Sequence, residues 1–291
     1  MPCLCPACAL PVPIPFVTPV PPLRHSLRNQ LALACTSSNP TSDLHSCNLE
    51  CLDSNAFDFP GASHVTTVNM QYSNFAELPV ELLKKMTSLV KFDGQYLTNL
   101  KTLPARFFSG QTQLKVLNLR GSTNLGAQED TRLPDGLFQG LTSLEDLTLE
   151  NCQYKHLPDM SGLTALKTFF SPSGGQLHMS DEESESKFDG LVSTEAVALT
   201  DQSLTRVPSI KNMKSLVSLW LESNKITKIF PGDFEGATRL TVLTLGGNKI
   251  VSVAAAAFVN LAVFRVKPEE LNLTKSDGTP FQDQYGIGAY S

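Results

Sequence analysis

Aliphatic residues recur along most of the chain at fixed offsets, with polar residues between them. A clear copy of this pattern runs from Leu216 to Phe234, and the copy that begins at Leu240 has aliphatic residues, an asparagine and a phenylalanine at the same offsets. The shared template is LxxLxLxx(N/C)xLxxLPxxxFxxLxx, in which L stands for any aliphatic or similar residue. Successive copies lie 22 to 30 residues apart and begin at Val65, Leu89, Leu114, Leu144, Leu166, Thr194, Leu216, Leu240 and Phe264. Internal repetition of this length predicts a solenoid, in which each copy forms one turn and stacks on the next.

Each part of the template predicts a local structure. In the LxxLxLxx part the side chains of an extended segment alternate, so the leucines point inward and the residues between them point outward. The stacked segments then form a parallel sheet, and neighbouring copies bury the apolar side that no single copy can bury alone. Asn224 and Asn248 follow this segment, where an inward amide can bond backbone groups that the turn leaves unpaired. Cys152 has the same position and is predicted to be a buried, unreactive thiol. The back half of the core is predicted to be filled by Phe108, Phe138, Phe234 and Phe258.

The segment from Leu133 to Leu149, which reads LPDGLFQGLTSLEDLTL, carries the proline, the phenylalanine and the leucines of the template in order. This segment and its repetitions resemble leucine-rich repeats of the 24-residue subclass found in extracellular receptors such as Toll-like receptors, in Slit-type proteins and in matrix proteoglycans. The resemblance covers about 200 of the 291 residues. It implies an α/β solenoid, a leucine-rich repeat horseshoe with a parallel concave β-sheet and a mostly irregular convex side.

The pattern divides the chain into four parts. Residues 1–34 are rich in proline and are predicted to be disordered, because proline at this density removes the backbone donors of a helix. They do not have the basic start and continuous apolar helix of an ordinary secretory signal. Residues 35–64 are predicted to form an N-terminal cap with cysteines, and about eight repeats are predicted over 65–264, with an inserted acidic loop near 171–193. Residues 265–291 are predicted to be a C-terminal tail or the remnant of a cap.

The seven cysteines leave the cellular compartment open, since their number is odd. Cys35, Cys47 and Cys51 precede the first copy, where disulfide bonds could staple a cap. Proteins that resemble this chain often have four-cysteine caps at both ends, whereas no cysteine follows Cys152 here. Either the chain is a fragment, or its C-terminal residues cover the last layer of the core. The resemblance favours an extracellular or cell-surface protein, and a cytoplasmic protein is the alternative.

Composition and motifs exclude several kinds of function. The net charge is −5, which argues against the positive surface that nucleic-acid binding needs. The two longest weakly polar stretches are residues 2–23, which hold eight prolines, and residues 251–264, which number only fourteen, so we expect no transmembrane segment in this chain. The five histidines form no metal-binding motif, and the CxxC of Cys5 and Cys8 lacks a second pair nearby. We therefore expect no enzyme, no catalytic residues, no metal and no cofactor.

The candidate binding residues are those that the repeats turn outward. Trp220, the only tryptophan, stands between two inward leucines, and Phe170 has the same position in an earlier copy. An exposed tryptophan is a common interface anchor, although Trp220 could instead pack flat over Thr244 and Ala198 and contact nothing else. The further candidates stand at or near the next outward position, and they are Glu222, Glu150, Arg120 and Asp146.

The predicted function is that of a non-enzymatic module that binds a protein or peptide ligand on the concave face. The resemblance favours an extracellular receptor or adhesion-type protein, and an intracellular scaffold or regulatory subunit is the alternative. The acidic residues among the candidates suggest a basic partner, with ordinary solvated charge as the other interpretation. The oligomeric state does not follow from the sequence.

Overall fold

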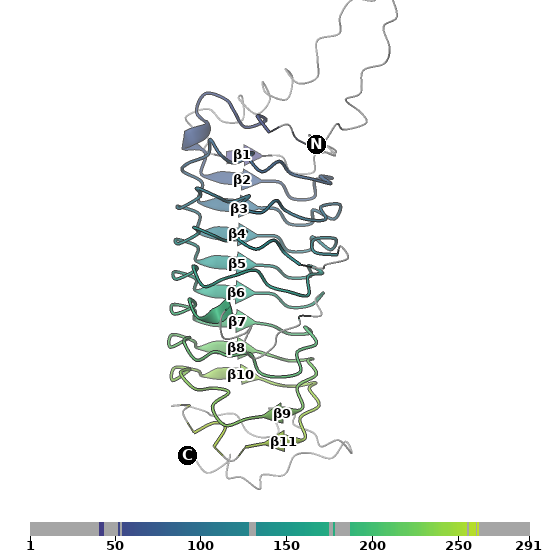
Figure 1. Cartoon of the computed structure of the whole chain (residues 1–291), viewed down its shortest axis with the longest axis vertical. Helices are drawn as coiled ribbons and strands as arrows, with labels where there is room; N and C mark the ends of the chain where they lie inside the picture. The colour runs from purple at the N-terminus through teal and green to yellow at the C-terminus, as the bar shows by residue number, and fades with distance from the viewer. Residues whose placement is uncertain are drawn as a thin grey trace, which may run out of the picture.

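Short parallel strands, one from each turn of the chain, form a single sheet along one side of the stack in the computed structural model (Figure 1). The structure describes residues 41–43, 52, 54–127, 132–174, 177, 187–254, 256–259 and 261. The strands of this sheet follow the order β1-β2-β3-β4-β5-β6-β7-β8-β10, and every neighbouring pair is parallel. They are β1 (Thr41–Asp43), β2 (Thr67–Asn69), β3 (Lys91–Asp93), β4 (Val116–Asn118), β5 (Asp146–Thr148), β6 (Thr168–Phe170), β7 (Ala196–Ala198), β8 (Ser218–Trp220) and β10 (Val242–Thr244).

The remaining described elements lie outside this sheet. A second, small sheet joins β9 (Lys228–Ile229) to β11 (Ser252–Val253) in parallel. Helix is scarce in the described part of the chain, where it consists of the 3₁₀ turn η2 (Ala62–His64) and residues 187–188. The predicted solenoid with a parallel sheet and a mostly irregular return side is therefore confirmed. We call the outward side of the nine-stranded sheet, which the sequence predicts to be concave, the sheet face.

The eight strands β2 to β8 and β10 each begin two residues after a predicted start of the template. Strand β1 was not predicted, because residues 41–43 do not follow the template and were assigned to the cap. It pairs with β2 in register, from Thr41 opposite Thr67 to Asp43 opposite Asn69. An edge strand offers unpaired backbone groups to any extended segment, so β1 needs no leucine pattern to join the sheet. The proline-rich segment 1–34, residues 265–291, the acidic stretch 178–186 and the cysteines before Leu52 lie outside the described residues.

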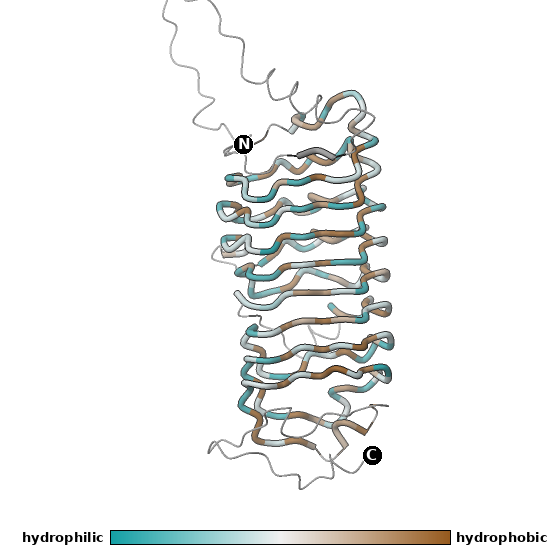
Figure 2. Tube along the Cα trace, turned by 180° about the vertical axis from the view of Figure 1, so that it is seen from behind, coloured by the Kyte–Doolittle hydropathy of each residue, from teal (hydrophilic) through white to brown (hydrophobic). Residues whose placement is uncertain are grey.

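The core is one continuous hydrophobic cluster that extends from Phe57 to Leu261. The middle residue of each of the strands β2 to β8 and β10 is buried in it, and Leu147 and Leu219 have no exposed surface. Of the predicted phenylalanines, Phe108, Phe138 and Phe234 are fully buried, while Phe258 is partly buried and stacks on Phe234 with 5.4 Å between ring centroids. Hydrophobic segments recur from one turn to the next along the stack (Figure 2).

The chain leaves the sheet through the same left-handed turn in all eight repeats. The eighth template position has a positive φ throughout, at Tyr72, Tyr96, Gly121, Asn151, Ser173, Asp201, Ser223 and Gly247. Only two of these residues are glycine, so most repeats bear the strain that a side chain adds in this conformation. Backbone bonds between turns hold the geometry: the N–H of Asp201 donates to the carbonyl of Glu222, and that of Ser223 to Gly246.

Buried polar side chains close the unpaired backbone groups that follow the strands, as the template predicts. The Oδ1 of Asn248 accepts from the backbone N–H of Ile226 at 3.0 Å, and its Nδ2 donates to the Leu221 and Leu245 carbonyls, both at 2.8 Å. Asn224 makes the same kinds of bond one turn earlier. Cys152 is fully buried and donates its thiol to the Leu119 carbonyl at 3.2 Å. Its predicted burial is confirmed, and this burial raises the pKa of Cys152 to about 12, which disfavours the reactive thiolate.

Two further residues take this role without matching the asparagine or cysteine of the template. Ser122 is fully buried, accepts from the Leu97 N–H at 3.2 Å and donates to the Gly94 carbonyl at 3.1 Å. Gln202 is also buried and donates to the Ser171 carbonyl. Both residues stand at the ninth template position, so alignment of the copies by position rather than by residue type could have identified them.

Candidate protein-binding face

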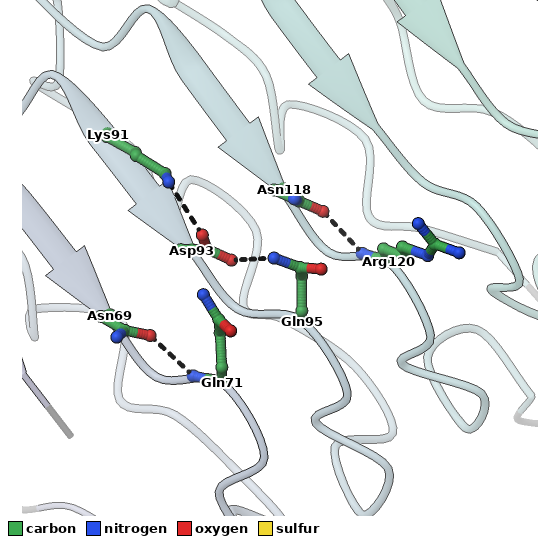
Figure 3. Close-up of polar contacts among 7 residues, drawn as sticks. All are labelled: Asn69, Gln71, Lys91, Asp93, Gln95, Asn118 and Arg120. Carbon is green, nitrogen blue, oxygen red and sulfur yellow. Dashed lines mark hydrogen bonds and ion pairs between the residues drawn. The ribbon is translucent and has the colours of Figure 1, made fainter. Parts of the chain in front are cut away.

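The sheet face is polar along β2, β3 and β4 (Figure 3). Asn69 accepts from the backbone N–H of Gln71 at 3.2 Å, and Asn118 accepts from that of Arg120 at 3.1 Å. These bonds tie the outward side chains to their own turns. The polar zone is completed by Asp93, whose carboxylate accepts from Lys91 Nζ at 3.0 Å and from Gln95 Nε2 at 2.9 Å.

Charged residues in the middle of the sheet face pair with one another. Arg120 Nη2 lies 3.1 Å from Glu150 Oε1, which joins two of the predicted binding residues across one repeat. Glu145 stands just before β5. Its carboxylate oxygens lie 2.8 Å from Lys115 Nζ and 2.5 Å from Lys167 Nζ. The hydrogen bonds from the two lysines lower the pKa of Glu145 to about 2, and the bond from Lys115 has the largest effect. This part of the face therefore balances its own charges.

A third predicted residue, Asp146, is also engaged within the fold. Its carboxylate accepts a hydrogen bond from the hydroxyl of Thr168, which is its partner in the register of β5 and β6. Asp146 is half-buried, so its side chain lies on the sheet face as predicted.

Two aromatic rings meet on the sheet face farther along the stack. Phe170 on β6 and Trp220 on β8 are separated by one strand, and Ala198 of β7 lies between them in register. The rings are stacked, with 5.9 Å between centroids and 30° between planes. The small side chain of Ala198 leaves room for the two rings to meet above β7. We call Phe170, Ala198 and Trp220 the aromatic zone.

The described contacts of Trp220 are all with residues of its own chain, so they leave open whether it is an interface anchor. It lies beside Thr244 and Ala198, as the interpretation of flat packing expects, but it also contacts Phe170. The stack was not predicted, although both aromatics stand in the same template position, two copies apart, with alanine between them. Both rings remain half-buried, so part of each faces solvent.

The surroundings of the aromatic zone differ from the rest of the face in charge. The strands β6, β7, β8 and β10, with the two outward positions that follow each of them, contain no lysine or arginine. They contain Asp201, which is exposed, and Glu222, which is half-buried. Two acceptor atoms here, Glu222 Oε2 and Thr244 Oγ1, are buried and have no hydrogen-bond partner among the described residues.

A second aromatic stack, which the sequence did not predict as a site, lies at the opposite end of the face. Tyr72 and Tyr96 occupy the left-handed turns after β2 and β3, and their rings stack with 4.7 Å between centroids. A side chain at Gly121, the next such turn, would clash with the Tyr96 ring at 2.4 Å. The signal that could have identified this stack is again a shared template position.

The described residues contain no group of three or more His, Cys, Asp or Glu side chains that could hold a metal ion. In the same part of the chain, no helix has the length and apolar character needed to cross a membrane.

Comparisons with known proteins agree with this architecture. Residues 191–250 and 214–265 match the family described as Leucine rich repeat. Rat lumican is 29% identical over 191 residues, which cover 66% of this chain and 52% of lumican. Human Toll-like receptor 8 is 26% identical over 208 residues, which cover 59% of this chain and 19% of the receptor. A solved structure of the Drosophila Toll–Spatzle complex superposes with a TM-score of 0.61 at 21% identity, over 76% of this chain and 28% of that one.

The stacked repeats and these matches show that the chain contains leucine-rich repeats and that it is similar to lumican and the Toll-like receptors. It spans about half of the length of lumican and about a fifth of that of Toll-like receptor 8.

Proposed function

We propose that this protein is a non-enzymatic recognition module that binds a protein or peptide on its sheet face, with the aromatic zone as the centre of the contact. The single observation that supports this proposal best is the stack of Phe170 and Trp220. Large aromatic side chains contribute much of the binding energy at protein interfaces, and tryptophan is prominent among them.

The stack also prepares these rings for binding. Each ring limits the rotamers of the other, so less side-chain entropy remains to be lost when a partner covers them. Hydrogen bonds and ion pairs hold polar and charged side chains of the face between β2 and β6. Such a rigid surface is suited to a contact that changes little on binding.

We further propose that the protein acts outside the cell, as a receptor or adhesion-type protein. The support comes from its relatives: two of them are named Toll-like receptors, and the structural neighbour is Toll in complex with Spatzle. That neighbour binds a protein partner, which is the class of ligand proposed here.

A selection from a random peptide library displayed on phage tests the binding proposal, because it does not require the natural ligand to be identified first. The full chain would be the target, and each enriched peptide would be measured against Phe170→Ala and Trp220→Ala. We expect Trp220→Ala to weaken binding by more than about 1 kcal/mol, which is roughly five-fold or more, with little change in thermal stability.

Phe230→Ala serves as the matched control. Phe230 is also an exposed aromatic residue, but it lies beside β9, outside the nine-stranded sheet. Its removal should leave peptide affinity unchanged. Peptides that bind the parent chain and both sheet-face variants equally well would refute the proposed site.

The location of the protein is tested separately, in the cells that make it. Intact-mass measurement of the natural product, before and after reduction, would report processing and disulfide bonds. A secreted product with a bridge among Cys35, Cys47 and Cys51 supports the extracellular proposal. A cytosolic, fully reduced product would contradict it and favour the intracellular scaffold or regulatory subunit.

A further inference from the structure

Glu222 carries a carboxylate oxygen for which the described part of the fold supplies no hydrogen bond. Its Oε2 is buried, and no described donor reaches it. The residue as a whole is half-buried, so part of it faces solvent. A carboxylate that is partly desolvated and lacks a donor gains more from a ligand that brings one than a fully solvated carboxylate would. Thr244 Oγ1, opposite Trp220 in the register of β8 and β10, is a second buried atom without a partner in the described residues.

The same chain has one other glutamate at this template position, and that glutamate is paired. Glu150 occupies the equivalent place after β5, and Arg120, at the same place after β4, reaches it at 3.1 Å. The equivalent residues on the two sides of Glu222 are Thr200 and Gly246, which carry no positive charge. Gly246 has no side chain at all, so it leaves space beside the carboxylate.

Trp220 lies two residues before Glu222 on the same side of the chain, with Leu221 buried between them. An indole face attracts a cation, and it attracts a planar guanidinium best because the two groups can stack. This chain already makes such a contact elsewhere, where the Arg206 guanidinium lies 4.5 Å from the centroid of the Phe230 ring. An aromatic face beside a carboxylate that lacks a donor is therefore a site for an arginine side chain.

We propose that the aromatic zone, together with Glu222, binds an arginine of a basic peptide segment in the partner. The guanidinium stacks on Trp220 and donates to the Glu222 carboxylate, while Asp201 attracts the remaining positive charge of the segment. This inference rests on the proposed function, since it names the chemistry of the ligand for the same face. Arginine is favoured over lysine because its guanidinium both stacks and donates two bonds in one plane, which a compact ammonium does not.

Trp220 is the only tryptophan of the chain, so tryptophan fluorescence reports directly on this site. Synthetic tetra-arginine amide would be titrated into the full chain at about 0.15 M salt, where screening weakens general attraction between exposed charges, and the emission of Trp220 recorded. Tetralysine and tetracitrulline amides are the matched probes, the second of them being close to arginine in shape but uncharged. We expect tetra-arginine to bind at least five-fold more tightly than tetralysine, and tetracitrulline to give no saturable change.

Charge variants then localise the contact. Glu222→Gln should weaken tetra-arginine binding about five- to twenty-fold, because a neutral amide accepts a weaker hydrogen bond than a carboxylate. The control is Glu235→Gln, which removes the same charge from an exposed residue of the return segment, next to Phe234. Equal affinity for arginine and lysine, or equal losses in the two variants, would overturn the inference in favour of general charge attraction.

The phage selection separates this inference from the proposed function. Peptides that depend on Trp220, contain arginine and lose affinity in Glu222→Gln support both. Peptides that depend on Trp220 but contain no basic residue and ignore Glu222→Gln overturn the arginine site and leave the proposed function standing. If no enriched peptide depends on Trp220, both are wrong.

Discussion

Asn224 offers a direct test of how the repeats are held together, through the variant Asn224→Ala. Its Oδ1 accepts from the backbone N–H groups of Gln202 and Leu204, both at 3.0 Å. Its Nδ2 donates to the carbonyls of Leu199 and Leu221, at 2.8 and 2.9 Å. All four bonds are buried, and three of them reach into the preceding turn. Removal of the side chain therefore affects the junction between two repeats as well as its own turn.

The magnitude follows from the groups that lose their partner. The Leu221 carbonyl keeps the bond from Asn248 Nδ2 at 2.8 Å, so it is not left unsatisfied. The two N–H groups and the Leu199 carbonyl lose the bonds described above. A buried group without its partner costs about 1 to 3 kcal/mol, so even values near the lower end predict a loss of about 3 to 5 kcal/mol in the free energy of unfolding.

Urea denaturation of the full chain, followed by far-ultraviolet circular dichroism and by Trp220 emission, measures this loss. Asn69→Ala is the control, because Asn69 is a half-buried asparagine of the sheet face whose Oδ1 accepts one bond from the backbone of Gln71. We expect it to cost less than about 1 kcal/mol. A loss below about 1 kcal/mol for Asn224→Ala, with an unchanged dependence on urea, would refute the account of the asparagine ladder.

Three further predictions concern the core, one close contact and pH. Leu219→Ala should cost about 2 to 5 kcal/mol in urea denaturation, since this side chain has no exposed surface. Gly236→Ala should lower the melting temperature far more than Gly140→Ala: both glycines have a positive φ, but an added Cβ would lie 2.0 Å from a backbone oxygen at Gly236 and meets nothing within 4 Å at Gly140. The pKa of Glu145 is lowered to about 2, so its pairing stabilises the fold above its ordinary pKa of 4.5, and this contribution is lost as the pH falls from 4.5 toward 2. Glu145→Gln should therefore flatten stability against pH in that window, and an unchanged profile would contradict the pairing.

The strands could be predicted from the sequence because every repeat buries aliphatic side chains at the same positions of the template. The inward leucines have a strict offset, so the first residue of eight strands could be placed. The sequence did not predict β1, since residues 41–43 do not follow the template, although they pair with β2 in register. Ser122 and Gln202 were missed for a related reason: the residue that reaches the backbone from the ninth position is an asparagine or cysteine in some copies and a serine or glutamine in others, since several polar residue types can make these bonds.

In the candidate site, too, the sequence predicts the direction of the side chains but not the contacts between them. The outward direction of Phe170 and Trp220 follows from the alternation of an extended strand. Their stack depends on Ala198 and on the register of three strands, which brings together residues 50 positions apart. The pairing of Arg120 with Glu150, and the lack of such a partner for Glu222 among the described residues, likewise follow from which turns are neighbours.

The sequence by itself determined the repeat, the strand in each copy and the division of side chains between the core and the surface, because these depend on short-range alternation along one chain. Only the tertiary structure decided which outward side chains meet. The copies differ in length from 22 to 30 residues, and backbone bonds between neighbouring turns set their register regardless of that length. The chemistry of the sheet face is therefore a property of the stack, since it depends on neighbouring turns that no single repeat contains.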